Sequence, residues 1–190
     1  MLLKRTFSNG FNFIEMMTAL GIAGILGVTG LNSYRKQRHQ ARTVQAQYSL
    51  SNIYAAEKNF KTQWKAYHEN LYIIGAIPEG ELWYDAGFTD TPVTVPHYPW
   101  QSKLTTAACN TYDQICNNDC ANAVKGTYTA SYYGGFTCKV KSSVKVKGQT
   151  GYGATATAFE ALARAELNSL DEWTINEKQE LTHKTDGTGN

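Results

Sequence analysis

The chain has 190 residues, which suits one globular domain plus an additional segment, because single domains commonly contain about 100 to 200 residues. It carries 18 Lys and Arg against 16 Asp and Glu, and the excess equals the two basic residues Lys4 and Arg5. This near-neutral balance excludes nucleic-acid binding driven by bulk charge. Aromatic residues make up 12% of the chain, a content that argues against a disordered protein.

Residues 1–10, MLLKRTFSNG, form a short basic segment that ends in glycine. The next stretch, residues 11–31, is almost entirely apolar. As a helix it is about 32 Å long at ~1.5 Å per residue, enough to cross a hydrocarbon core of about 30 Å. No small-residue cleavage motif follows Leu31, so the sequence predicts that this helix stays attached as a transmembrane segment.

The orientation of that segment follows from the cysteines. More basic residues follow the apolar stretch than precede it, and the positive-inside rule alone places such residues in the cytoplasm. Disulfides, however, need an oxidising compartment. We therefore expect residues 35–190 to lie outside the cytoplasm.

The helix is expected to continue far beyond the apolar stretch, to about Tyr67, because neither Pro nor Gly occurs from residue 31 to residue 74. At 100° per residue, one narrow arc of its second half gathers apolar side chains, which predicts packing on a sheet. The aromatic members also fit an electron-conducting path, an alternative that we favour less. The stripe consists of Ala46, Ile53, Phe60, Trp64 and Tyr67, with Leu50 at its edge.

Patterns typical of strands and turns occupy the rest of the chain. Residues 89–103 contain three prolines and predict a surface loop. Residues 126–142, GTYTASYYGGFTCKVKS, alternate around two glycines and predict an antiparallel pair of strands. Residues 151–167 fit a strand better than a short helix. Residues 173–184 resemble a terminal hairpin.

Four cysteines cluster in one region of the chain: Cys109, Cys116, Cys120 and Cys138. In an exported chain an even count predicts two disulfides, and three pairings are possible. The alternative is a structural zinc site, but gaps of six, three and seventeen residues match no common zinc pattern. We therefore expect disulfides and no metal.

Groups that would support catalysis are scattered along the sequence. The four histidines sit beside polar residues, and we expect each to be a solvated surface residue; they are His39, His68, His97 and His183. Residues 117–119 offer oxygens to calcium, although three polar residues between cysteines more often form a turn. No phosphate-binding loop or nucleophile elbow is present. We expect a non-enzyme without a cofactor.

Glu15 is the unusual residue of the apolar stretch. A carboxylate costs on the order of 2.5 to 3.5 kcal/mol at the centre of a membrane helix, so it needs a position near the surface or a partner. Cleavage after Gly10 would give Phe11 a free ammonium group, one helical turn from Glu15. Within one chain this pairing is awkward. Between two chains offset along a bundle the two charges neutralise each other.

The junction of a basic leader ending in Gly10, then Phe11, then the carboxylate of Glu15 in an apolar helix strongly resembles type IV prepilins and pseudopilins. The resemblance is strong over residues 1–35 and moderate afterwards. It implies cleavage after Gly10 by a prepilin peptidase, methylation of Phe11 and a docking role for Glu15. Asn32 stands where many pilins carry a proline that kinks the helix, which is a departure from the pattern.

The fold implied by this resemblance is α+β, with a long N-terminal helix packed on an antiparallel sheet of about four strands. Its parts are a leader (1–10), a transmembrane and assembly helix (11–34) and a globular head (35–190). The implied partners are further copies of the subunit, the peptidase and an inner-membrane assembly platform. Nucleic acid is expected as a partner only if the filament takes up DNA. The subunit is expected to cross the inner membrane once and then to join an extracellular pilus.

Three functions remain open at this stage. The first is a type IV pilus subunit that supports adhesion, motility or DNA uptake. The second is a pseudopilin of a type II secretion system, which often lacks a disulfide-bounded C-terminal region. The third is an anchored binding domain that never polymerises. The four cysteines favour the first.

Overall fold

The computed structural model describes residues 12–89, 109–117 and 137–187. The chain divides into two compact units, Met1–Gln40 and Ala41–Asn190. The long helix α1, Phe13–Trp64, contributes to both units and spans 52 residues. This confirms a long N-terminal helix, and its backbone remains helical through residue 32. The predicted proline loop (90–103) and most of the predicted strand pair (126–136) lie outside the described residues.

The helix ends three residues earlier than the sequence predicts. Lys65 adopts a left-handed backbone conformation with φ 62°, while its N–H still donates to the Lys61 carbonyl at 2.8 Å. This geometry closes the last turn and redirects the chain. Tyr67 therefore lies beyond the helix, although it is fully buried as predicted.

A four-stranded antiparallel sheet forms the centre of the second unit, in the order β2-β4-β5-β6. Its strands are β2 (Asp85–Gly87), β4 (Glu160–Glu166), β5 (Leu170–Asn176) and β6 (Leu181–Thr185). The predicted strand within residues 151–167 and the terminal hairpin are both confirmed, by β4 and by the pairing of β5 with β6. The architecture is thus α+β with an antiparallel sheet.

A second, smaller sheet contains the described end of the predicted strand pair. Strand β3 (Cys138–Val140) pairs in parallel with β1 (Gly80–Leu82), with Glu81 opposite Lys139. The partner of β3 in the described structure comes from 58 residues earlier in the chain, while the predicted antiparallel partner, within residues 126–136, lies outside the described residues and stays a prediction. Long-range pairing of this kind leaves no local signal in the sequence.

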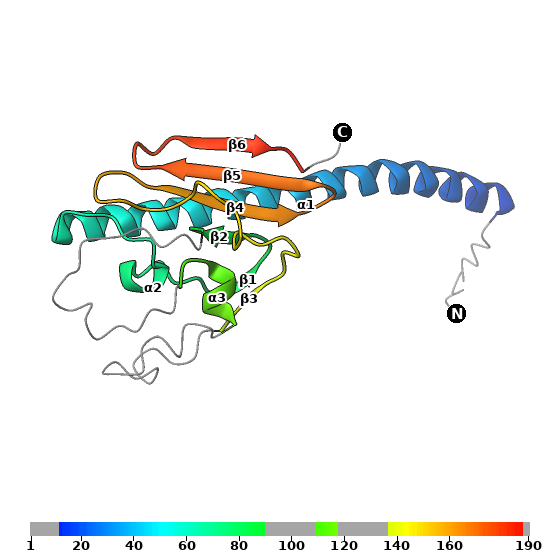
Figure 1. Ribbon diagram of the computed structural model, residues 1–190. Coiled ribbons are helices and arrows are strands. Elements are labelled where there is room, and N and C mark those ends of the chain that lie inside the picture. The colour runs from blue at the N-terminus through cyan, green and yellow to red at the C-terminus, as the bar shows by residue number, and fades with distance from the viewer. Residues whose placement is uncertain (1–11, 90–108, 118–136, 188–190) are drawn as a thin grey trace, which may run out of the picture. The chain divides into compact units, whose positions relative to one another are not determined.

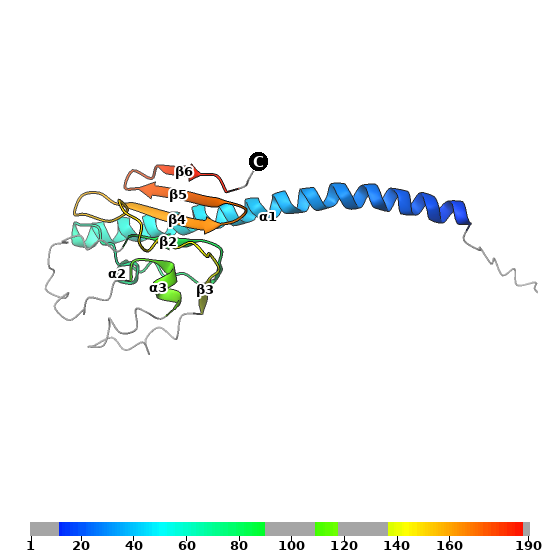
Figure 2. The same ribbon diagram turned by 45° about the vertical axis from the view of Figure 1, so that its right-hand side comes forward.

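The core lies between one face of the sheet and the second half of α1, as the views in Figures 1 and 2 agree. Small alanines on β4 face larger residues on β5, with Ala161 opposite Ile175 and Ala163 opposite Trp173. From α1, four of the predicted stripe residues are buried in the core: Ala46, Leu50, Ile53 and Phe60. Trp64 was wrongly included, since it is 40% exposed.

Two short helices complete the described fold. Helix α2 (Leu71–Ile74) begins where the Asn70 side chain accepts hydrogen bonds from two backbone N–H groups, and it ends at Gly75 with φ 80°. Helix α3 (Tyr112–Cys116) begins with a capping box formed by Thr111 and Gln114. Such caps satisfy backbone donors that a short helix otherwise leaves unpaired. Both helices went unpredicted because each is shorter than two turns.

Candidate functional site

The first turn of α1 contains the carboxylate that the sequence analysis singled out. The Asn12 carbonyl accepts from the N–H groups of Glu15 and Met16 at 2.9 and 3.2 Å, so the helix begins immediately after Asn12. Glu15 is exposed, as are all the apolar residues around it. A negative group at this end is favoured by the partial positive charge of the helix N-terminus.

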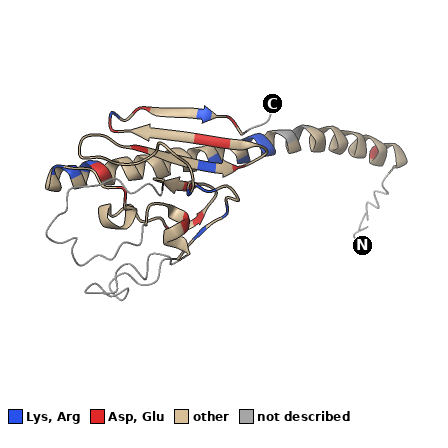
Figure 3. Ribbon diagram, in the orientation of Figure 1, with Lys and Arg blue, Asp and Glu red and all other residues tan. Residues whose placement is uncertain are grey.

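Apolar side chains follow Glu15 on every side of the helix and remain uncovered. Phe13 is 78% exposed, Leu20 69% and Leu31 60%. In the described part of the chain this helix alone is long and apolar enough to cross a membrane, and none of its apolar window is buried. Figure 3 shows this stretch in tan with one red turn near its start and blue turns after it. Such a surface requires a bilayer or other apolar partners.

Polar and small residues within the apolar stretch are accommodated locally. Thr18 donates from Oγ1 to the Glu15 carbonyl at 3.0 Å, so its hydroxyl is satisfied within the helix. Gly24, Gly27 and Gly30 have open space where a Cβ atom would lie. Each glycine weakens the helix by roughly 1 kcal/mol relative to alanine, and each lets another backbone approach closely.

Three of the four cysteines lie in the described part of the chain, whereas the predicted processing residues do not. Gly10, Phe11 and Cys120 lie outside the described residues. Cys116 and Cys138 form a disulfide, which links the end of α3 to the start of β3. Cys109 is buried and is also disulfide-bonded. Among the described cysteines none is free, so the expectation of disulfides holds for these three residues.

In the second unit, polar contacts connect α1 to β1 and to Trp83, the residue that follows it. The Gln45 side chain donates to the Glu81 carbonyl at 2.9 Å and accepts from the Trp83 N–H at 2.7 Å. Two cations lie over the Trp83 ring, with the Arg42 guanidinium 3.7 Å and the Lys141 Nζ 4.8 Å from its centroid. These contacts fix the helix along its axis.

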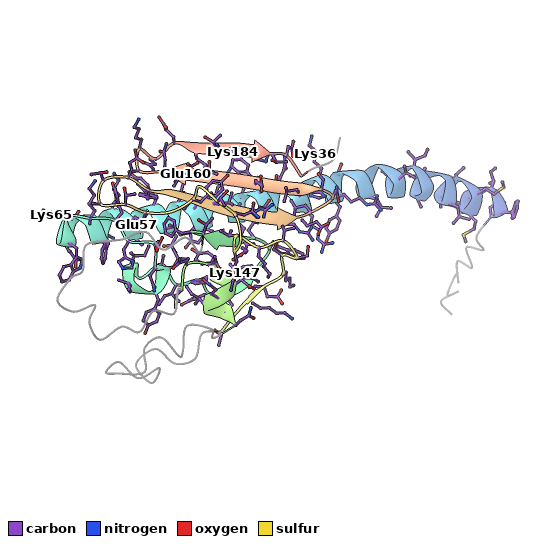
Figure 4. All side chains as sticks on the ribbon, in the orientation of Figure 1. Lys36, Glu57, Lys65, Lys147, Glu160 and Lys184 are labelled. Carbon is purple, nitrogen blue, oxygen red and sulfur yellow. A yellow bond between two sulfur atoms is a disulfide. The ribbon has the colours of Figure 1, made fainter. Side chains whose placement is uncertain are left out.

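A buried carboxyl group on the core face of α1 was not predicted from the sequence. Glu57 is fully buried, and its Oε2 accepts from the His68 N–H at 3.1 Å. Burial raises the pKa of Glu57 to about 8, while the His68 bond opposes the shift and the charge of Glu69 adds to it. Figure 4 labels Glu57 in the C-terminal half of α1. Glu57 occurs four residues after Ile53 and three before Phe60, so the apolar stripe itself marks it as a core position.

Of two histidines expected at the surface, His68 is buried, whereas His183 is exposed as expected but makes specific contacts. His68 is buried against Phe60, with ring centroids 5.7 Å apart, and burial lowers its pKa to about 4. His183 stacks on Trp173 at 4.0 Å between centroids and contacts Asp171 at 2.7 Å. Their polar neighbours in sequence gave no indication of these positions.

Asp171 is the centre of a buried polar cluster. Its oxygens accept from the Trp173 ring N–H at 3.0 Å and the Gly187 N–H at 2.9 Å, and also from the Tyr84 hydroxyl. Asp171, His183 and Asp186 offer ligand atoms within 4.8 Å of one another, a grouping that the sequence analysis missed. Because these donors occupy both oxygens of Asp171, the cluster serves to hold β5, β6 and the C-terminal segment together.

A comparison with protein-family models finds no match, and a comparison with curated proteins likewise finds none.

Proposed function

We propose that this chain is a pilin-like structural subunit, which is held in a membrane by the first half of α1 and polymerises into a filament through that same segment. The observation that carries the proposal is the exposed Glu15 carboxylate in the first turn of an uncovered apolar helix. The resemblance of the 1–35 junction to type IV prepilins, cleaved after Gly10, supports the same conclusion.

The Glu15 carboxylate is costly in an apolar medium unless an opposite charge lies beside it. A carboxylate there costs on the order of 2.5 to 3.5 kcal/mol at mid-membrane. The ammonium group that cleavage would create at Phe11 has the opposite charge. A neighbouring copy, displaced along the helix axis, brings its amine beside this carboxylate and removes the penalty from both groups. This charge pairing therefore favours assembly, and it also sets the distance along the helix axis between neighbouring copies.

Features of the second unit fit a subunit that works outside the cytoplasm. The Cys116–Cys138 disulfide requires an oxidising compartment. The long helix and antiparallel sheet agree with the layout of the pilin fold, which we propose for this chain. A pseudopilin uses the same junction, and the disulfide-linked region is the feature that favours a pilus subunit over it.

The test is a Glu15→Ala variant of the full-length chain, expressed together with a prepilin peptidase and assembly platform. We expect the variant to remain in the membrane fraction at the parental level and to be missing from sheared filaments. Thr18→Ala is the matched control, because its hydroxyl bonds only within its own helix in the described structure. Normal filament yield from Glu15→Ala contradicts the assembly role of Glu15, whereas a parent chain that stays in the membrane fraction and never enters filaments supports a simple membrane anchor.

A further inference from the structure

A basic collar follows the apolar stretch of α1 directly. We define the collar as Arg35, Lys36 and Arg38, all of which are exposed. At 100° per residue their side chains spread over an arc of about 160° around the helix. No Asp or Glu occurs between Glu15 and Glu57, so the collar has no acidic neighbour along α1. An arc of this width covers nearly half of the helix circumference.

The axial position of the collar matches the polar region of a bilayer. At ~1.5 Å per residue, Arg35 lies about 6 Å and Arg38 about 11 Å beyond Leu31. The headgroup region extends roughly 5 to 8 Å beyond the hydrocarbon core on each side, and long basic side chains reach back toward it. Tyr34, at 63% exposure, occupies the level at which aromatic residues mark the interface.

The charge of the remaining chain distinguishes the collar from a general basic surface. Residues 41–190 contain 13 Lys and Arg against 15 Asp and Glu. The nearest basic residue of the second unit, Arg42, lies over the Trp83 ring. Binding to a nucleic acid needs several phosphate contacts along a basic face, which this excess of acidic residues opposes. Positive charge beside an apolar segment instead favours anionic lipid.

We propose that the basic collar binds the anionic headgroups of phospholipids and so selects the lipids around the subunit before assembly. This inference rests on the membrane insertion included in the proposed function. The attraction of an anionic surface for one Lys or Arg corresponds to about fivefold in an equilibrium constant. The collar thereby fixes the depth of α1 in the bilayer, with Leu31 at the edge of the hydrocarbon.

The experiment uses the full-length chain in phosphatidylcholine vesicles with a trace of nitroxide-labelled phosphatidylglycerol or phosphatidylcholine. Electron paramagnetic resonance measures the motionally restricted fraction of each labelled lipid. We expect the parent to prefer phosphatidylglycerol by about fivefold at low salt, with the preference falling in 1 M NaCl because salt screens exposed charges.

The variant Arg35→Gln/Lys36→Gln/Arg38→Gln is expected to lose this preference, and replacing the two arginines by Lys is expected to retain it. The matched control removes three exposed charges from the second unit, as Lys139→Gln/Lys147→Gln/Lys178→Gln, and is expected to keep the parental preference. Preference that survives the collar variant, or that disappears equally in the control, overturns the proposal.

Two further outcomes separate this proposal from the one on which it rests. Restricted lipid without a preference refutes lipid selection by the collar and leaves membrane insertion intact. The absence of any restricted lipid refutes insertion itself. If duplex DNA at an equal phosphate concentration abolishes the preference and binds only the chain with an intact collar, the collar is a nucleic-acid site and the lipid proposal is wrong.

Discussion

The buried Glu57 carboxyl predicts how the stability of the protein depends on pH. Its pKa is raised from 4.5 to about 8, chiefly by burial. Between these values the unfolded chain releases the proton while the folded chain retains it, so the free energy of unfolding falls as pH rises. A difference of about 3.5 pKa units corresponds to about 5 kcal/mol. This contribution is complete below pH 4.5 and lost above pH 8.

Glu57→Gln removes the titration and keeps both the side-chain shape and an oxygen that can accept from the His68 N–H. We expect the variant to match the parent near pH 4 and to exceed it by about 5 kcal/mol near pH 9. Asp85, whose pKa burial raises to about 6, titrates in both proteins, so its effect cancels in the comparison.

Urea unfolding of the full-length chain in nonionic detergent, followed by tryptophan fluorescence from pH 4 to pH 9, measures this difference. The matched control is Glu79→Gln, which removes an exposed carboxylate. If the stability difference between Glu57→Gln and the parent is the same at both ends of the pH range, the carboxyl is not held neutral by burial and the reasoning fails.

Two further changes test the head by urea unfolding. Replacing Cys116 and Cys138 by Ser removes a disulfide with a sequence separation of 22 and is expected to lower the free energy of unfolding by about 3 kcal/mol. An unchanged urea midpoint shows that this disulfide does not restrict the conformations of the unfolded chain. Gly87→Ala is expected to cost at least about 3 kcal/mol, because Gly87 has φ 148° and a Cβ there would lie 2.0 Å from the Asn110 carbonyl oxygen. Gly148→Ala, in open space at φ 84°, is the control and is expected to cost about 1 kcal/mol. Equal losses for both glycines contradict the clash.

Local patterns in the sequence were sufficient for the elements that depend on local interactions. The absence of Pro and Gly after residue 31 predicted the long helix, and alternation predicted the β5–β6 hairpin. The hairpin turn is also local, since the Asn176 side chain accepts from the N–H groups of Lys178 and Glu180 at 3.0 Å each. The helix end at Lys65 was missed because a non-glycine residue at φ 62° carries no sequence signal.

Buried polar groups were the main part of the molecule that the sequence analysis did not anticipate. Glu57 lies at the spacing of the apolar stripe and was passed over because it is polar by type, whereas His68 reaches the core only through its packing against Phe60 of α1. Asp171 acquires its donors from Tyr84, His183 and Gly187, which come from distant segments. For the candidate site, the docking role of Glu15 stays a prediction from the sequence, while the structure shows that the apolar residues around it are uncovered.

The account depends most directly on a new amine forming at Phe11 within reach of a Glu15 carboxylate from another copy. Intact-mass and N-terminal peptide mass spectrometry of filaments sheared from cells therefore provides the most direct test. The account predicts chains that begin at a methylated Phe11 and lack residues 1–10. Filaments built from chains that still begin at Met1 would contradict it.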